Sequence, residues 1–233
     1  MKGYATRRDT LRMLAVTAGG AFMTADVFRA TRPAAAQGLI SGAGVCTIMP
    51  ETTAGPFYFD PRLDRSDIAE GRPGIALAMR FQIVDAACRP LPGARLDVWH
   101  CDAEGAYSGY GGQPGGLDTR GETFLRGTQV SGADGTVAFS TIYPGWYPGR
   151  TPHVHFTAIL ADGRTSVTGQ MFFPDAVSRQ VYSNVAPYNS RPAGEATYND
   201  RDGIARRAGA PALAELTDRG GGLGSALVIS VAG

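Results

Sequence analysis

Residues 153–173 read HVHFTAILADGRTSVTGQMFF, and this stretch decides the fold. Two runs rich in β-branched and aromatic residues lie on either side of Asp162-Gly163. An Asp-Gly pair between such runs predicts a tight β-hairpin, because the turn needs positive φ. Successive side chains of a strand point to opposite faces, so His153 and His155 would share one face. The stretch therefore predicts two paired strands that carry two imidazoles on one surface.

The rest of the chain repeats this pattern of short apolar runs separated by turn residues. We expect strands over residues 75–84, 94–100, 123–130, 136–142, 153–160, 165–173 and 226–231. A second pair, Asp134-Gly135, predicts another tight hairpin. Short strands at this spacing predict an all-β fold, an antiparallel β-sandwich with long loops and little helix.

Two segments lack the strand pattern. Residues 38–74 and 175–225 are rich in Pro, Gly and polar residues, and we expect long loops there. Within the second segment, residues 208–216 are expected to form a short helix. The sequence contains no internal repeat and no second domain.

The first 36 residues look like a targeting signal. Arg7-Arg8 is followed by a weakly apolar, Gly- and Ala-rich stretch over residues 13–23 and then by Ala34-Ala35-Ala36. These features are typical of a twin-arginine export signal, and the apolar stretch is too short for a membrane span. We therefore expect residues 1–36 to engage the twin-arginine export machinery. Residues 37–233 are then one periplasmic or secreted domain.

The charge balance argues against one class of partner. Six of the 22 basic residues and two of the 21 acidic residues fall within the first 36 positions, which leaves 16 basic and 19 acidic residues. Binding to nucleic acid requires a basic stripe, and the arginines here are scattered. We expect no nucleic-acid partner, and the sequence leaves the oligomeric state open.

The chain has three cysteines, Cys46, Cys88 and Cys101. In an exported protein two of them are expected to form a disulfide, which leaves the third free. If residues 81–87 and 94–101 form a hairpin, Cys88 lies near its turn and Cys101 at its far end, so this pair is disfavoured. Cys46 is the expected partner of one of the other two, and the sequence does not decide which.

A metal bound by His153 and His155 needs further ligands, and the nearby sequence offers tyrosines. Tyr147 precedes His153 by six residues across a Pro-Gly turn, close enough to reach the same ion. A second candidate is Tyr107, which follows a predicted strand, with Tyr110 as the competing choice. Two phenolates and a bound hydroxide would balance Fe(III) but would over-neutralise Zn(II). If both tyrosines are ligands, this charge balance favours ferric iron.

Five segments in a fixed order carry a family resemblance. They read ETTAGPFY at 51–58, DVWHCDAEGAYS at 97–108, FLRGTQ at 124–129, TIYPGWY at 141–147 and RTPHVHF at 150–156. In this order they resemble the intradiol ring-cleavage dioxygenases, the family of protocatechuate and catechol dioxygenases. The resemblance spans residues 46–204 and points to the exported, single-domain branch.

The resemblance implies an enzyme that uses non-haem Fe(III) and O2. Its expected substrate is a small aromatic diol, cleaved between the two hydroxylated carbons to a cis,cis-muconate-type diacid. The metal ligands that it implies are Tyr107, Tyr147, His153 and His155. Tyr147 is also expected to leave the metal when the diol binds and to accept one of its protons.

The resemblance also assigns roles around the metal. Arg150 is expected to stabilise negative charge that develops on the ring, and Gln170 to contact the site. We interpret His100 as structural or as a neighbour of the metal ligands rather than as a fifth ligand, and Trp99 and Trp146 as packing residues rather than substrate contacts. Neither Arg120 nor Arg126 can be placed against a substrate carboxylate from the sequence. The choice among catechol, protocatechuate, hydroxyquinol and lignin-derived diols therefore stays open.

Two other interpretations remain. A secreted β-sandwich binding module would bind no iron and would not depend on Tyr107. A zinc hydrolase would use His153, His155 and a carboxylate such as Asp102, and it would be colourless. The colour of the purified protein separates these alternatives from a ferric enzyme.

Overall fold

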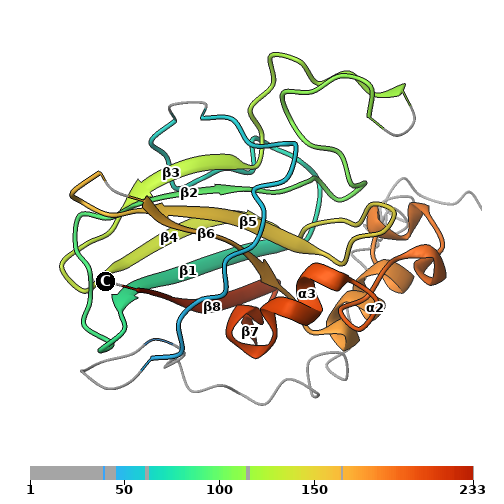
Figure 1. Cartoon of the computed structure of the whole chain (residues 1–233). Helices are drawn as coiled ribbons and strands as arrows, with labels where there is room; N and C mark the ends of the chain where they lie inside the picture. Colours follow the sequence, from blue (N-terminus) through green and yellow to red (C-terminus); the bar gives the residue numbers. More distant parts are fainter. Residues whose placement is uncertain (1–38, 40–45, 61–62, 114–115, 164, 233) are drawn as a thin grey trace, which may run out of the picture.

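The computed structural model describes residues 39, 46–60, 63–113, 116–163 and 165–232. The predicted export signal, residues 1–36, lies outside them. The described chain forms two four-stranded sheets that pack face to face (Figure 1). This confirms the predicted all-β sandwich.

The first sheet has the strand order β3-β2-β5-β6, and the second has the order β4-β1-β8-β7. The strands are β1 Ala76–Asp85, β2 Arg95–Trp99, β3 Arg126–Val130, β4 Thr136–Ile142, β5 His153–Ile159, β6 Thr165–Phe172, β7 Glu215–Asp218 and β8 Gly222–Val231. All seven predicted strands are present, and β7 is additional. One pairing differs from the antiparallel expectation, because β1 and β8 run parallel from Ala76↔Gly222 to Asp85↔Val231. The second sheet is therefore mixed.

The two Asp-Gly turns have different outcomes. Asp162-Gly163 forms the predicted hairpin, since β5 and β6 pair antiparallel around it. Asp134-Gly135 does not, because β3 and β4 lie in opposite sheets and the chain crosses between the sheets there. Both glycines have positive φ, 70° at Gly163 and 74° at Gly135. The dipeptide thus specifies a tight turn, but it does not specify which strand the following strand pairs with. Here β4 pairs with β1.

Residues 175–225 contain more regular structure than predicted. They hold helices α2 (Asp175–Asn184) and α3 (Gly203–Ala208), the 3-10 turns η3 (Tyr188–Ser190), η4 (Ala193–Glu195) and η5 (Ala210–Ala212), and strand β7. The predicted helix over residues 208–216 is wrong, because Gly209 with φ 63° ends α3 and the chain continues through η5 into β7.

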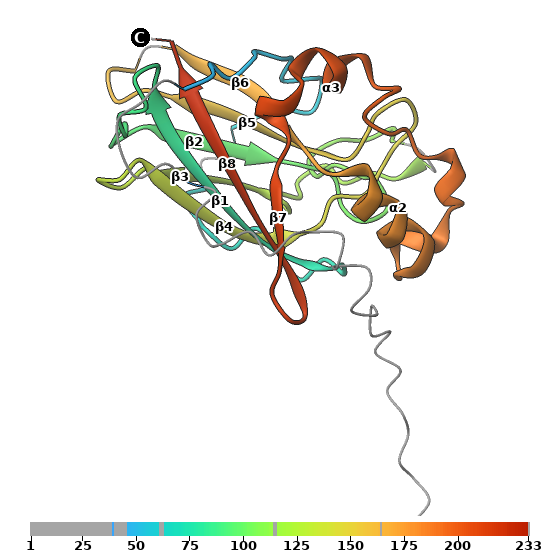
Figure 2. The same ribbon diagram turned by 90° about the horizontal axis from the view of Figure 1, so that it is seen from below.

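Both helices lie at the end of the sandwich away from the C-terminus (Figures 1 and 2). None of the helices in the described ranges has the length and hydropathy of a membrane span.

The core lies between the two sheets. Val154, Phe156 and Ala158 of β5 point into it and are fully buried. Phe156 packs directly against Gly169 on β6, where any added Cβ would collide with the ring. The alternate residues of β5, beginning with His153, therefore point to the outer face of the first sheet.

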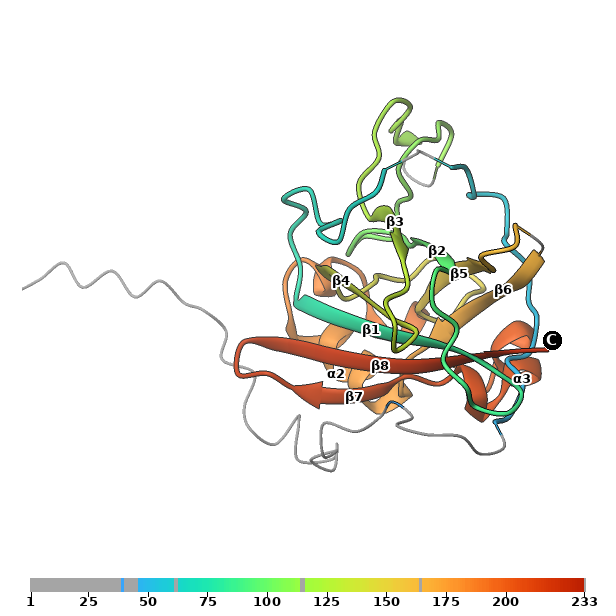
Figure 3. The same ribbon diagram turned by 90° about the vertical axis from the view of Figure 1, so that its left-hand side faces the viewer.

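A covering segment, residues 46–60, lies over that outer face. It first runs past β8 and β6, where Met49 N–H donates to the Ser230 carbonyl at 2.8 Å and Thr52 N–H to the Thr168 carbonyl at 2.9 Å (Figure 3). It then crosses the sheet, and the Phe57 carbonyl accepts from Arg126 at 2.7 Å. The polar face of the sheet is thereby kept out of bulk water.

A disulfide between Cys46 and Cys88 fixes the start of the covering segment. This is one of the two pairings that the sequence left open, and Cys101 is free and buried. The hairpin considered for residues 81–101 does not form, because β1 and β2 lie in opposite sheets.

Candidate metal centre

Four side chains form one row across the outer face of the first sheet. The strand register pairs Trp99 on β2 with Arg126 on β3 and with His155 on β5, and it pairs His155 with Gln170 on β6. All four are almost completely buried. Buried polar groups are uncommon and need partners, so this row marks a specialised region of the sheet.

Two histidines and two tyrosines converge beside this row. Tyr147 Oη lies 3.1 Å from His153 Nε2, which lies 3.0 Å from His155 Nε2. Tyr107 Oη lies 3.4 Å from His153 Nε2 and 3.5 Å from Tyr147 Oη. Ligands bonded at about 2.0–2.1 Å to one ion lie roughly 3 Å from one another. The four atoms therefore have the spacing of a single metal site.

The tautomer of His153 suits metal binding. Its Nδ1 lies 2.6 Å from the Thr151 carbonyl, which can only accept, so Nδ1 carries the proton and Nε2 presents a lone pair to the centre. Burial, with the Arg150 charge second, lowers the pKa of His153 to about 3. Burial likewise lowers the pKa of His155, with the His153 charge second. Both imidazoles are neutral at pH 7, the form that binds metals.

His155 is held by stacking. Its ring lies 4.9 Å from the Trp99 ring at an interplanar angle of 5°. Its buried Nδ1 makes no hydrogen bond to the described residues, and the nearby Thr53 carbonyl accepts from Gln170 Nε2 at 2.9 Å instead. The Nε2 atoms of His155 and His153 lie 3.0 Å apart, so without a metal His155 Nε2–H can donate to the lone pair of His153 Nε2, and a bound metal ion would take the place of that proton.

The phenols also require a cation before they can ionise. Burial raises the pKa of Tyr147 to about 12 and that of Tyr107 well above its ordinary value of 10. A bound metal ion reverses this preference, because its charge favours the phenolate. The centre thus combines two neutral imidazoles with two phenols that only a metal would deprotonate near pH 7.

A loop fixes Tyr107 through its backbone. The Gln113 carboxamide accepts from Tyr107 N–H and donates to the Tyr107 carbonyl, both at 2.7 Å, and Thr119 Oγ1 donates to the same carbonyl at 2.6 Å. The competing Tyr110 points elsewhere, since its hydroxyl donates to the Tyr58 carbonyl at 3.0 Å. The structure brings Tyr107, and not Tyr110, to the cluster.

Arg150 and Gln170 also lie together. Arg150 Nη2 contacts Gln170 Oε1, and Arg150 Nε donates to Asp202 Oδ2 at 2.8 Å. Burial alone would raise the pKa of Asp202, but the bonds from Arg150 and from Thr151 N–H hold it below its ordinary value. Asp202 did not emerge from the sequence as a site residue, although an Asp before a helical run is a typical N-cap signal.

Two other candidate metal ligands, His100 and Asp102, bind partners outside the cluster. His100 Nδ1 donates to the Cys101 carbonyl and its Nε2 accepts from Thr141, both at 2.8 Å, so no ring nitrogen is left for a metal. Asp102 pairs with Arg72 at 2.7 Å. Within the described ranges, no three His, Cys, Asp or Glu side chains are grouped to hold a metal ion. A zinc hydrolase would therefore lack its carboxylate.

The two unplaced arginines are engaged in structural contacts. Arg126 is buried and donates to the Ser108 hydroxyl and carbonyl and to the Phe57 carbonyl. Arg120 is exposed and pairs with Asp118. Both guanidinium groups are therefore already paired within the protein.

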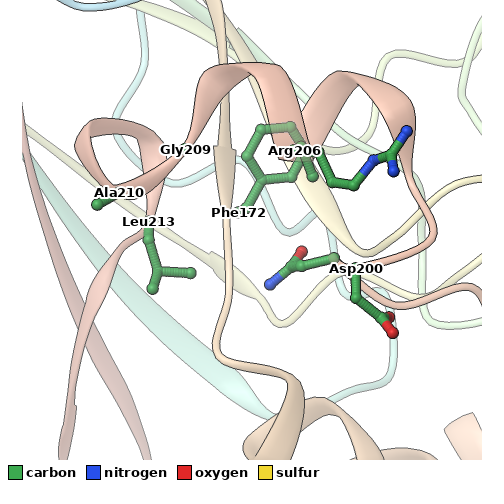
Figure 4. Close-up of a pocket in the computed structure, with 8 residues that line it drawn as sticks. Phe172, Asp200, Arg206, Gly209, Ala210 and Leu213 are labelled. Atoms are coloured by element: carbon green, nitrogen blue, oxygen red, sulfur yellow. The ribbon is translucent and has the colours of Figure 1, made fainter.

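A groove of about 360 Å³ lies beside β6 and α3. Arg206 and Asp200 lie on one side of Phe172, and Ala210 and Leu213 on the other (Figure 4). None of the four converging side chains lines this groove. It is therefore separate from the candidate metal centre.

Comparisons with known proteins, by sequence and by structure, both match this chain to dioxygenases. A family model described as dioxygenase matches residues 53–178. Hydroxyquinol 1,2-dioxygenase of Nocardioides simplex is 30% identical over 178 residues, which cover 65% of this chain and 58% of that protein. This chain thus spans little more than half the length of that relative.

Solved structures match over more of their length. An intradiol ring-cleavage dioxygenase from Tetranychus urticae is 34% identical, with a TM-score of 0.71, covering 80% of this chain and 94% of that one. The dioxygenase domain of a dioxygenase carbohydrate-binding protein fusion from Streptomyces sp. SirexAA-E is 27% identical, with a TM-score of 0.60, covering 79% and 98%.

Proposed function

This chain belongs to the intradiol ring-cleavage dioxygenase family, and from that premise we propose that it uses a non-haem ferric ion and O2 to open a catechol-type ring. The bond that breaks joins the two hydroxylated carbons, and both atoms of O2 enter a cis,cis-muconate-type diacid. The observation that carries the proposal is the convergence of Tyr107, Tyr147, His153 and His155 at 3.0–3.5 Å.

These four side chains would hold the ion. Phenolates are hard anionic donors that suit Fe(III) better than Zn(II). A bound ferric ion would supply a Lewis acid that favours the deprotonated diol and an electron acceptor that gives the ring the radical character needed to react with O2. The other roles in the reaction would fall to side chains of the protein.

Tyr147 is suited to move aside for the diol. It is only half-buried, whereas Tyr107 is fully buried and stacks on Phe57 with ring centroids 4.3 Å apart. The Tyr147 phenolate would accept one proton of the incoming diol at Oη, which makes this ligand a general base.

Arg150 and Gln170 would stabilise the charge that the ring acquires. The guanidinium is fixed beside the centre by Asp202 and Gln170, so its donors need no rearrangement during the reaction. The covering segment, through Gly55 next to His155, limits access of water from that side.

The visible spectrum of the iron-loaded protein tests the proposal. We expect a red-brown phenolate-to-iron band that shifts when catechol is added, with one O2 consumed per ring. With ¹⁸O2, both labelled atoms should appear in the diacid. A colourless protein that remains inactive after ferric loading would favour the binding-module alternative, and one that binds only zinc would favour the hydrolase.

We also propose that residues 1–36 are a twin-arginine export signal and that residues 37–233 act as a periplasmic or secreted domain. The Cys46–Cys88 disulfide supports this, because disulfides persist mainly in oxidising compartments. Replacing Arg7 and Arg8 by lysine should leave an uncleaved chain in the cytoplasm, as read by intact mass after fractionation. Unchanged export would contradict this second proposal.

A further inference from the structure

Asp202 is a buried carboxylate with partners on two sides. Its side chain is 2% exposed. Oδ1 accepts from Ile204 N–H at 2.7 Å and from Ala205 N–H at 3.2 Å, which caps α3. Oδ2 accepts from Arg150 Nε at 2.8 Å and from Thr151 N–H at 3.0 Å. One oxygen thus serves the helix, and the other faces the metal centre.

Both partners on the second side lead directly to candidate site residues. Arg150 contacts Gln170, which lies opposite His155 in the strand register. The Thr151 carbonyl accepts from His153 Nδ1 at 2.6 Å and so fixes the tautomer of that ligand. A single carboxylate therefore restrains the guanidinium and the peptide that orients one histidine.

We propose that Asp202 is the positioning residue of this centre, holding Arg150 toward the substrate and the Thr151 peptide against His153. The inference rests on the proposed function. It assigns a role to a residue outside the matched family region, residues 53–178. A free arginine side chain samples many rotamers, and a buried carboxylate that immobilises it in advance removes the entropic cost of ordering it from the reaction.

The chain offers a matched control in the same segment. Asn199 Oδ1 accepts from Thr151 Oγ1 at 2.9 Å and its Nδ2 donates to the Phe173 carbonyl at 2.8 Å. Asn199→Ala therefore removes a partner of the Thr151 side chain, while Arg150 and the contacts of the Thr151 peptide with Asp202 and His153 stay in place. Arg150→Ala supplies the second partner for a double-mutant cycle.

Two readouts are measured on parent, D202N, Asn199→Ala, Arg150→Ala and D202N/Arg150→Ala. The first is the rate at which phenylglyoxal modifies Arg150 in the metal-free protein, mapped by mass spectrometry. The second is kcat and KM with catechol and iron. We expect D202N to speed modification and to lower kcat about 10–100-fold with little change in KM, as for other residues that orient a metal site.

In the Arg150→Ala background, D202N should lower kcat by a smaller factor than in the parent, because only the contact with Thr151 N–H remains to be lost, and the cap of α3 should be kept, since asparagine caps a helix as well as aspartate does. Asn199→Ala should lose stability but keep the parent kcat and modification rate. Equal modification rates in D202N and Asn199→Ala, or independent effects of D202N and Arg150→Ala on kcat, would overturn the proposal and leave a helix cap only.

The measurements distinguish a failure of the proposed function from a failure of the role proposed for Asp202. Should the parent not cleave catechol, the proposed function falls, while the modification rates in the metal-free protein still test Asp202. If D202N does not fold, Asp202→Glu takes its place, because it keeps the charge but displaces it by one methylene.

Discussion

The two faces of β5 are built from alternate residues of one short strand, yet they differ in how they are specified. Val154, Phe156 and Ala158 fill the core, where size and hydrophobicity decide the fit. On the opposite face, the two histidines meet partners from a distant loop, from the adjacent turn and from strand β2, each in a defined orientation. Stability and chemistry are therefore separable along a single strand, and substitutions on the two faces should have different consequences.

The largest effect is expected on the outer face, from His155→Ala. Loss of one of four ligands should abolish the phenolate-to-iron band and lower turnover about 10³-fold or more, or roughly 4 kcal/mol. The metal-free protein should lose less unfolding free energy than Phe156→Ala does, because the ring removed is smaller, although its stacking on Trp99 and its contact with His153 Nε2 at 3.0 Å are lost. Iron content, the visible spectrum and denaturant unfolding of the metal-free protein measure this. Retention of the band would break the comparison.

Phe156→Ala tests the inner face. It removes a fully buried ring, which should cost about 3–5 kcal/mol of unfolding free energy. The protein that remains folded should keep its iron band, because the neighbouring ligands point the other way. Chemical denaturation and spectra at low temperature check both parts. A lost band with unchanged stability would show that the two faces are not separable.

Replacing Cys46 and Cys88 together by alanine tests the cover over the outer face. Removing a disulfide that closes a loop of 42 residues should cost about 2–4 kcal/mol, through greater freedom of the unfolded chain. Iron binding should survive, since Thr53 and Phe57 are held independently of it. Calorimetry under oxidising conditions measures the loss. An unchanged melting temperature would mean that the covering segment needs no covalent anchor.

Of these substitutions, Tyr110→Phe should have the smallest effect. Tyr107→Phe is its matched comparison. Tyr110 loses one hydrogen bond to the Tyr58 carbonyl, worth about 1 kcal/mol, and the iron band should remain. Tyr107→Phe should instead remove a ligand and change the band. A bleached Tyr110→Phe protein beside a coloured Tyr107→Phe protein would reverse the assignment.

The fold was predictable where its causes are local. Alternating apolar runs identified seven strands, because burial of one face imposes a period of two. The crossing at Asp134-Gly135 was missed, since one turn geometry serves both a hairpin and a change of sheet. Helix α2 was missed because residues 175–184 are mostly polar and carry no N-cap side chain.

The candidate site, like the fold, was predictable from the sequence only in part. The shared face of His153 and His155 follows from strand periodicity, and the structure brings Tyr107 and Tyr147 to them. Gln113 and Asp202 were not found, because their partners are backbone groups or side chains far away in the sequence. Such contacts between a side chain and distant backbone groups become visible only in the folded structure.

The parallel pairing of β1 with β8 governs when this domain can form. Its first pair, Ala76↔Gly222, joins residues 146 positions apart. Contacts of such long range slow folding, because the closure entropy must be met before they contribute. During synthesis β1 therefore has an unpaired edge until β8 emerges, and an unpaired apolar strand is prone to aggregation. Strand β8 thus sets the timing of folding, although the four converging side chains lie elsewhere.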